Sequence, residues 1–197
     1  MTDVLPVCLS LAEALHDDPF YRAVTIESEE DEEHRKAVLA DYFALAMTEA
    51  LGIGEVQYAR DDGAAIWHTN EAAEEAKSFI LARKHGLAKL LGDSGFGNYT
   101  RISQSMSQHI PLHLSDAWYL SILGVRPAAR GQGLAQRLIE RTLSRADREG
   151  AVCFLETFNP LSLPFYRRLG FKDAIACFEK VTERDYWILT RQPISSD

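Results

Sequence analysis

Hydrophobic and polar positions change their period midway along the chain, and the change predicts a strand, a loop and a helix in succession. Residues 118–125 are apolar on both alternating faces, as in a central strand that is covered on each side. From Leu134 onward, apolar residues recur at spacings of three and four, which predicts a helix with one buried face. Gly131 and Gly133 lie in the loop between these two elements.

The same patterns predict the remaining elements. Two short alternating runs flank an Asp-Gly turn at 62–63, which is typical of a hairpin. No linker or repeat divides the 197 residues, so we expect one domain over 1–197 with a helical insertion at about 70–115. In chain order we expect a helix over 9–24 interrupted at 17–19, a helix over 32–51, the hairpin over 55–60 and 64–68, helices over 71–91 (with Asn70 as N-cap) and 99–110, and strands over 152–158, 171–181 and 186–190.

Composition excludes several classes of function. The net charge is −8, whereas nucleic-acid binding through phosphates needs a basic face. No apolar run approaches the roughly 20 residues of a membrane span, and the first residues lack a basic leader, so we expect a cytoplasmic protein. The three cysteines, Cys8, Cys153 and Cys177, are scattered without metal-ligand spacing, which favours free thiols and no metal site.

The loop around Gly131 and Gly133 has the features of an anion-binding site. The first amides of a helix have no partner within it and carry the positive end of its dipole. Glycine leaves room for a phosphate beside those amides. Residues 126–149 contain six arginines against three acidic residues. The segment matches neither the P-loop nor the dinucleotide-binding fingerprint, so we expect a pyrophosphate-bearing ligand of another class.

Two motifs follow one another in this half of the chain. The first, which fits the pattern Arg/Gln-x-x-Gly-x-Gly/Ala, is Arg130-Gly131-Gln132-Gly133-Leu134-Ala135. The second is Leu155-Glu156-Thr157-Phe158-Asn159 followed by Tyr166-Arg167-Arg168-Leu169-Gly170-Phe171. In this order the two motifs resemble those of the GNAT superfamily of acetyl-CoA-dependent N-acetyltransferases. The sequences near them, Trp-Tyr-Leu and Leu-Pro-Phe-Tyr, are most similar to the puromycin N-acetyltransferase-like group, and the resemblance covers roughly residues 116–192.

This resemblance implies an α/β (α+β) fold of the GNAT type. Such a fold has a single mixed, mostly antiparallel sheet with a splayed central pair of parallel strands, and helices flank both of its faces. Acetyl-CoA would lie in the gap between the splayed strands, held by backbone amides of the first strand and of the glycine loop. Gly124 in that strand also suits a β-bulge. The residues implied at acetyl-CoA are Leu123, Gly124, Val125, Arg130, Gly131, Gln132, Gly133, Leu134, Ala135, Gln136, Asn159 and Tyr166.

Four side chains are candidates for chemistry or acceptor binding. The resemblance places Tyr166 at the thioester sulfur as a general acid. Glu156 interrupts an apolar strand, where burying a carboxylate without a partner is costly. One explanation is that Glu156 acts as a base or orients the amine. The other is that it accepts hydrogen bonds from the backbone or from an arginine and so fixes the following loop. Trp67 is expected either at the acceptor pocket or in the core. His109 is a secondary candidate for base or substrate contact, against a role as a core histidine.

The resulting hypothesis is an acetyl-CoA-dependent N-acetyltransferase that acts on a primary amine of a small antibiotic-like or metabolite molecule by direct attack on the thioester. Two alternatives stay open: a protein or peptide amine as acceptor, and a catalytically silent regulator that binds an acyl-CoA. Residues 70–115 resemble a lid over a small pocket more than a peptide groove. We expect no nucleic-acid or membrane partner, and the resemblance leaves a homodimer open.

Overall fold

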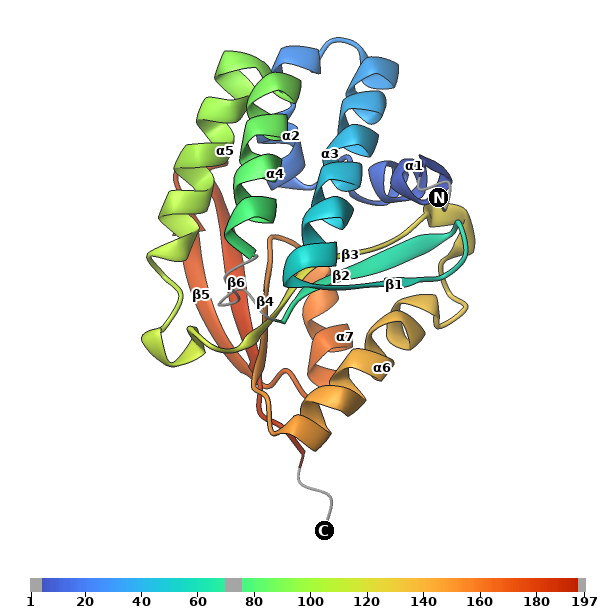
Figure 1. The fold of residues 1–197 in the computed structure, drawn as a ribbon, viewed down its shortest axis with the longest axis vertical. Helices are drawn as coiled ribbons and strands as arrows, with labels where there is room; N and C mark the ends of the chain where they lie inside the picture. The colour runs from blue at the N-terminus through green and yellow to red at the C-terminus, as the bar shows by residue number, and fades with distance from the viewer. Residues whose placement is uncertain (1–4, 70–75, 195–197) are drawn as a thin grey trace.

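Six strands form one mixed sheet in the computed structural model, which describes residues 5–69 and 76–194 (Figure 1). The strand order is β1-β2-β3-β4-β6-β5. Residues 70–75, with the expected N-cap Asn70 and the start of the helix over 71–91, lie outside the described residues. The strands are β1 (Gly54–Tyr58), β2 (Gly63–His68), β3 (Trp118–Val125), β4 (Cys153–Thr157), β5 (Asp173–Glu179) and β6 (Arg184–Arg191).

All neighbouring strands pair antiparallel except β3 and β4 at the centre. These two stay paired for only three residues, from Trp118 opposite Cys153 to Leu120 opposite Leu155. Beyond that point they separate, so residues 121–125 pair with no strand on the β4 side. The expected fold, a splayed parallel pair inside a mostly antiparallel sheet, is confirmed.

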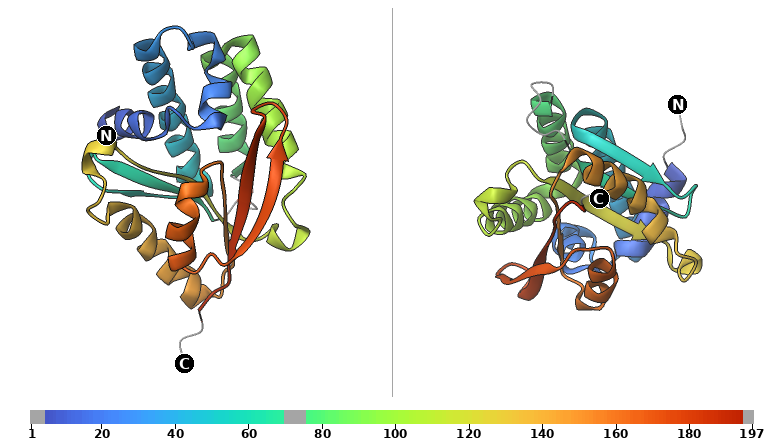
Figure 2. Two further views of the ribbon diagram at one scale, coloured as in Figure 1. Left: turned by 180° about the vertical axis from the view of Figure 1, so that it is seen from behind. Right: turned by 90° about the horizontal axis from the view of Figure 1, so that it is seen from below.

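Helices cover both faces of the sheet, as Figures 1 and 2 show. The α-helices are α1 (Leu5–Leu15), α2 (Pro19–Val24), α3 (Glu32–Ile53), α4 (Ala76–Leu90), α5 (Gly92–Ser107), α6 (Leu134–Glu149) and α7 (Leu163–Arg168). Short 3₁₀ helices are η1 (Ile26–Ser28), η2 (Leu112–Leu114), η3 (Pro127–Ala129) and η4 (Pro160–Ser162). Helices α1 to α4 share one apolar cluster with β2, α6 and α7 pack on the opposite face, and α5 packs against β4 and β6.

The bulge in β3 lies at Ser121. Ile66 of β2 pairs with Ile122, but the next residue of β2, Trp67, pairs with Leu120. Ser121 is therefore an extra residue on β3 with no partner on β2. An extra residue changes which side chains face each side of a sheet, because side chains alternate along a strand.

The expectation of a bulge at Gly124 was wrong. Gly124 pairs in register with Ala64 of β2. A Cβ at position 124 would come within 2.7 Å of Cδ2 of Leu11 on α1. Glycine at this position therefore allows α1 to pack closely on β3.

The helices differ from the sequence-based expectation mainly at α5. The helix expected over 9–24 is divided into α1 and α2 at the interruption before Pro19. Helix α5 begins at Gly92 and not at residue 99, because the glycines of its first turns do not end it. One of them, Gly95, lets α5 approach the backbone of Val24 at the end of α2. Tertiary packing thus outweighs the low helix propensity of glycine here.

Cys8 and Cys153 are buried free thiols, as expected, and Cys177 is a free, partly exposed one. Among the described residues, no helix has both the length and the apolarity that crossing a membrane requires. Within the same ranges, no three His, Cys, Asp or Glu side chains gather as ligands for a metal ion.

Candidate active site

A cleft of about 660 Å³ lies where β3 and β4 separate. We call it the strand cleft, and its wall also includes the loop before α2 and residues of α7. Of the residues expected at acetyl-CoA, the wall contains Leu123, Gly124, Val125, Arg130, Ala135, Asn159 and Tyr166. The others, Gly131, Gln132, Gly133, Leu134 and Gln136, belong to the adjoining loop and the first turn of α6 but do not line this wall.

The backbone of β3 directs two amides into the strand cleft. The N–H of Arg126 donates to the carbonyl of Asp62 at 2.9 Å, and hydrogen-bonded pairs alternate along an antiparallel ladder. The amides of Leu123 and Val125 are therefore directed away from β2, whereas the amide of Gly124 is directed toward it. Since β4 has separated at this point, Leu123 and Val125 offer two main-chain donors to a ligand in the cleft.

The loop before α6 leaves the first amides of that helix open. Gly133 is the N-cap of α6, and no side chain caps the helix there. Gly131 and Gly133 have positive φ angles of 80° and 70°, which glycine adopts without strain. A Cβ on Gly131 would have no described atom within 4 Å, and one on Gly133 would meet only the Arg137 guanidinium, at 3.4 Å. The loop therefore has the open amide cradle that a pyrophosphate group fits.

Arginines of this segment fix the shape of the loop. Nε of Arg130 donates to the carbonyl of Val125, and its Nη2 donates to the carbonyl of Ala14 on α1, both at 3.2 Å. Nη1 of Arg137 donates to the carbonyl of Gln132 at 2.8 Å. The motif residue Arg130 thus fastens the loop to β3 and α1, while its exposed side chain forms part of the wall of the strand cleft.

Asn159 and the turn after it position Tyr166. Oδ1 of Asn159 accepts a hydrogen bond from the amide of Leu161 at 3.0 Å, which shapes the approach to α7. The side chain of Tyr166 is 9% exposed. Burial raises the pKa of its hydroxyl above the ordinary 10.0, and the Asp18 carboxylate adds to the rise. Tyr166 is therefore protonated at neutral pH, as an acid for a leaving thiolate must be.

A second cavity, of about 310 Å³, adjoins the strand cleft. Its volume falls at the lower end of the range for small-molecule pockets. We call it the aromatic cavity, because its wall contains the rings of Phe20, Tyr21, Tyr42, Tyr99, Tyr119, Phe158 and Tyr166. The residues that line both cavities, and so mark their junction, are Leu15, Asp18, Leu123, Thr157, Phe158 and Tyr166.

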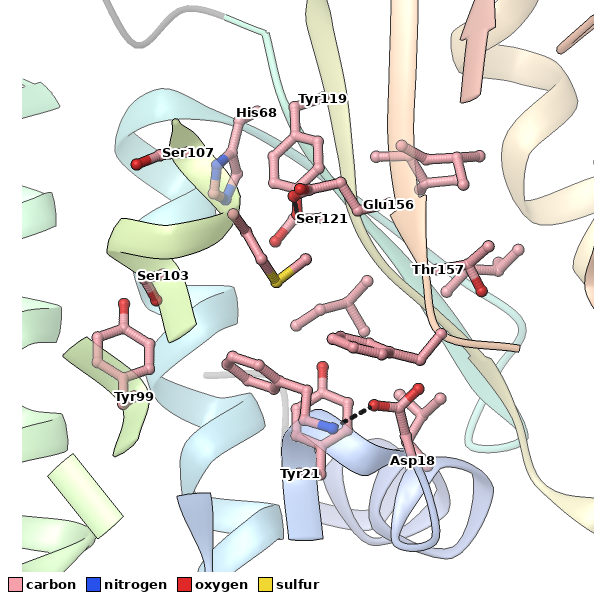
Figure 3. Close-up of a pocket in the computed structure, with 18 of the residues that line it drawn as sticks. Asp18, Tyr21, His68, Tyr99, Ser103, Ser107, Tyr119, Ser121, Glu156 and Thr157 are labelled. Atoms are coloured by element: carbon pink, nitrogen blue, oxygen red, sulfur yellow. Dashed lines mark hydrogen bonds between the residues drawn. The ribbon is translucent and has the colours of Figure 1, made fainter. Parts of the chain in front are cut away.

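Glu156 of β4 faces the aromatic cavity, close to Tyr119 (Figure 3). Its Oε2 accepts a hydrogen bond from the Tyr119 hydroxyl at 3.1 Å. Its Oε1 is buried and has no hydrogen-bond partner among the described residues. Burial raises the pKa of Glu156 from 4.5 to about 7, and the Tyr119 bond lowers it in part. Among the described residues, neither an arginine nor a backbone N–H donates a hydrogen bond to this carboxylate. The alternative in which such hydrogen bonds fix the following loop therefore does not match the structure.

A buried ion pair occupies another part of the wall. Nη1 of Arg83 on α4 lies 2.6 Å from Oε2 of Glu49 on α3. Nη2 of Arg83 donates to the hydroxyl of Tyr42 at 3.0 Å. Because Glu49 neutralises Arg83, the uncompensated carboxylates of the wall are Asp18 and Glu156. The aromatic cavity therefore favours a cationic ligand.

Residues 14–171, which include both motifs and the walls of both cavities except Glu13, match the acetyltransferase (GNAT) family. The chain belongs to the GNAT family of acetyltransferases. The strand cleft, with its free β3 amides and its open glycine loop, fits the acetyl-CoA that this family uses.

Two solved GNAT structures align with nearly the whole chain. One is the histone acetyltransferase HPA2 and related acetyltransferase from Corynebacterium glutamicum, 18% identical, covering 100% of this chain and 94% of that one with a TM-score of 0.59. The other is arylalkylamine N-acetyltransferase 2 from Aedes aegypti, also 18% identical, covering 96% and 94% with a TM-score of 0.54. At this identity the likeness establishes the fold alone.

A third structure, the NatC complex bound to Gag peptide and CoA, is 29% identical over 40% of this chain, with a TM-score of 0.36. The chain covers 52% of that protein's chain, or about half of its length. None of these three GNAT proteins is a puromycin N-acetyltransferase, so the resemblance to that group stays a prediction.

The structure places neither Trp67 nor His109, the two expected acceptor contacts, in the wall of either cavity. Trp67 is fully buried, 0% exposed, in the apolar cluster under α6, so the alternative of a core tryptophan holds. Side chains alternate along β2, and the next residue, His68, lines the aromatic cavity in its place. His109 is exposed, with Nδ1 3.2 Å from the hydroxyl of Tyr186, and lies outside both cavity walls.

Several polar residues of the aromatic cavity were not expected from the sequence. They include Asp18, His68, Arg83 and Tyr119. Strand alternation was a usable signal for His68, once Trp67 is assigned to the core. Asp18 precedes Pro19 in the pattern of a helix N-cap, and that pattern does not show that the residue also lines the cavity. Arg83 lies in a helix whose orientation depends on packing with α3, which sequence periodicity does not reveal.

Proposed function

We propose that the chain is an acetyl-CoA-dependent N-acetyltransferase that acetylates the primary amine of a small molecule by direct attack on the thioester. The observation that supports this most is the junction of the two cavities. A thioester in the strand cleft and an amine in the aromatic cavity would meet beside Leu123, Thr157 and Tyr166, which line both.

Main-chain groups would hold the donor. Acetyl-CoA supplies the thioester whose acetyl group is transferred. The amides of Leu123 and Val125 would bind the pantetheine part and polarise the carbonyl, and one such donor is worth about 3–4 kcal/mol in a transition state. The loop with Gly131 and Gly133 would take the pyrophosphate at the start of α6.

Two side chains would move the protons. An alkyl amine has a pKa of about 10 and is mostly charged at neutral pH. Glu156, whose pKa burial raises to about 7, would take a proton from it, directly or through water. The neutral nitrogen forms a bond to the acetyl carbon as the carbon–sulfur bond breaks, and Tyr166 gives its proton to the leaving sulfur. The second proton that the nitrogen loses on becoming an amide restores the hydroxyl of Tyr166. A thiol of pKa about 8.5 leaves fairly well unaided, so Tyr166 accelerates the step without being indispensable.

The size and lining of the aromatic cavity support a small acceptor. A volume of about 310 Å³ suits a compact amine with an apolar or aromatic group. A protein amine would instead need a groove that admits the neighbouring peptide. We include puromycin among the acceptors to test because the wording of the two motifs resembles that group.

The first experiment is a calorimetric titration of the protein with acetyl-CoA, free CoA and longer acyl-CoAs. A panel of primary amines, puromycin and an N-terminal peptide is then screened for thiol release. We expect acetyl-CoA to bind and at least one small amine to release CoA. The proposal fails if no CoA ester binds. Acetyl-CoA binding without thiol release would favour a silent acyl-CoA binder, and release with the peptide alone would favour a protein acceptor.

A further inference from the structure

Asp18 stands at the junction of the two cavities, and the proposed chemistry gives it no role. It lies in the short loop between α1 and α2 and lines both the strand cleft and the aromatic cavity. Figure 3 shows Asp18 at one end of the pocket beside Tyr21, and Glu156 at the other end beside Tyr119. The two carboxylates therefore reach the pocket from different elements. Asp18 is the one that also lines the strand cleft, where the thioester is proposed to bind.

Helix capping explains why a hydrogen-bond acceptor occupies position 18, but not why that acceptor is a carboxylate. Its Oδ1 accepts a hydrogen bond from the amide of Phe20 at 2.9 Å and caps α2. Asn and Ser cap a helix about as well as Asp does, and neither carries a charge that must leave water. An ionised carboxylate can also accept more hydrogen bonds than a cap uses. The cap alone therefore does not explain a carboxylate at this position.

The surroundings of Asp18 leave its charge uncompensated. None of the ion pairs among the described residues includes Asp18. The two nearest cationic side chains in the sequence, His16 and Arg22, pair with the neighbouring Asp17 at 3.2 Å and 3.5 Å. The guanidinium of Arg83 in the cavity wall is already paired on α3. Burial raises the pKa of Asp18 from 3.8 to about 6, although the amides of α2 lower it in part. A cation that enters from outside would supply the missing partner.

We infer that Asp18 is an acceptor-binding residue, whose carboxylate pairs with the ammonium group of the acceptor at the junction before the proton passes through water to Glu156 at the far end of the cavity. This inference rests on the proposed N-acetyltransferase function. Phe20 and Tyr21, which follow Asp18 along the chain and line the same cavity, add aromatic rings to the surface that an organic cation would meet. The acceptor class is a primary amine that binds in its charged form and carries an apolar or aromatic group into the remaining cavity.

The test measures binding of 2-phenylethylamine to the CoA-loaded protein by calorimetry, with 2-phenylethanol as its uncharged analogue. Asp18→Asn keeps an oxygen that can accept from the amide of Phe20, so the cap is preserved. We expect this variant to bind the amine at least about tenfold more weakly, because one partner of a desolvated charge pair is lost. Binding of 2-phenylethanol and of acetyl-CoA should not change. Asp18→Ser, a second cap-preserving variant, should behave in the same way.

The matched control is Asp31→Asn, since Asp31 caps α3 by accepting from the amide of His34 at 3.0 Å, away from both cavities. It should bind the amine like the wild type. In steady state, Asp18→Asn should raise KM for the amine and leave kcat nearly unchanged.

Three outcomes would overturn the inference. One is unchanged amine binding in Asp18→Asn. Another is equal weakening of the amine and the alcohol, which would mean a change of shape. The third is a wild type that does not bind 2-phenylethylamine at all. If the wild type binds the amine but never releases CoA, the N-acetyltransferase proposal fails, while the loss of amine binding in Asp18→Asn still supports Asp18.

Discussion

The strand cleft and the aromatic cavity meet at Tyr166, but different parts of the chain form their binding surfaces. The strand cleft offers backbone amides, positioned by strand register and by the φ angles of glycines. The aromatic cavity offers side chains from six helices and three strands, including Arg83, which is ion-paired with Glu49 behind it. A main-chain surface survives most substitutions, whereas a side-chain surface changes with each one. We therefore expect the first surface to bind the donor common to the family and the second surface to select the acceptor.

The largest effect is expected at Glu156, and it tests whether removal of the proton from the amine depends on the aromatic cavity alone. Glu156→Gln should lower kcat by about 10²- to 10⁴-fold, because the proton acceptor is lost. Acetyl-CoA affinity, which depends on the other cavity, should not change. In the wild type, kcat should rise as the pH passes about 7, where the Glu156 carboxyl ionises, and the variant should lack this rise. An identical pH profile in both proteins would contradict the assignment.

The same substitution should stabilise the fold at alkaline pH. The folded pKa of Glu156, about 7, lies above its ordinary 4.5, so the wild type loses stability as the pH rises through this interval. The shift corresponds to at most about 3 kcal/mol. Urea unfolding should show Glu156→Gln to be more stable by up to that amount at pH 8 and equal to the wild type at pH 4. Lower stability of the variant at pH 8 would argue against a raised pKa.

A substitution in the glycine loop should affect the strand cleft only. Gly133→Val places a β-branched residue at a φ of 70° and adds a side chain beside the first amides of α6. We expect acetyl-CoA to bind roughly tenfold more weakly or worse. Gly150→Val is the matched control, because Gly150 ends the same helix with a φ of 68° and has no atom within 4 Å of its Cβ position. Equal losses of acetyl-CoA affinity in both variants would mean that the loop does not bind the donor.

The smallest effect is expected at Tyr166, one of the residues that line both cavities. Tyr166→Phe should lower kcat by about tenfold and leave the affinity for acetyl-CoA unchanged, because a thiolate leaves fairly well without an acid. Tyr58→Phe, at an exposed tyrosine of β1 that is 52% accessible, serves as the control for loss of a hydroxyl. Equal turnover of Tyr166→Phe and the wild type across the pH range would remove the general-acid role.

The contrast between the cavities also explains which features could be predicted from the sequence. Strand β3 has the predicted bounds, and α6 begins at Leu134 as expected, because local periodicity and glycine spacing determine both. The free amides of Leu123 and Val125 follow from the splayed strands that the motifs implied. The junction residue Tyr166 also followed from a motif.

The aromatic cavity was harder to predict because it depends on how helices pack. Periodicity gives the buried face of a helix but not the neighbour that it meets, so Arg83 was missed. The helix predicted over 99–110 begins at Gly92 in the structure, because packing against α2 holds its glycine-containing first turns in helical form. Trp67 was the pocket candidate on β2 and His68 lines the pocket instead, since a pattern of alternation does not say which face is the pocket.

The extra residue in β3 decides which face of the sheet each later side chain of that strand covers. Up to Leu120, the even-numbered side chains of this strand face α6, and beyond Ser121 the odd-numbered ones do. Tyr119 therefore faces the aromatic cavity, whereas the side chains of Leu123 and Val125 pack toward α6 and their amides face the strand cleft. Deleting Ser121 would make the alternation continuous and reverse the face of every residue after it. The relative placement of the two cavities thus depends on the length of a strand as much as on any side chain.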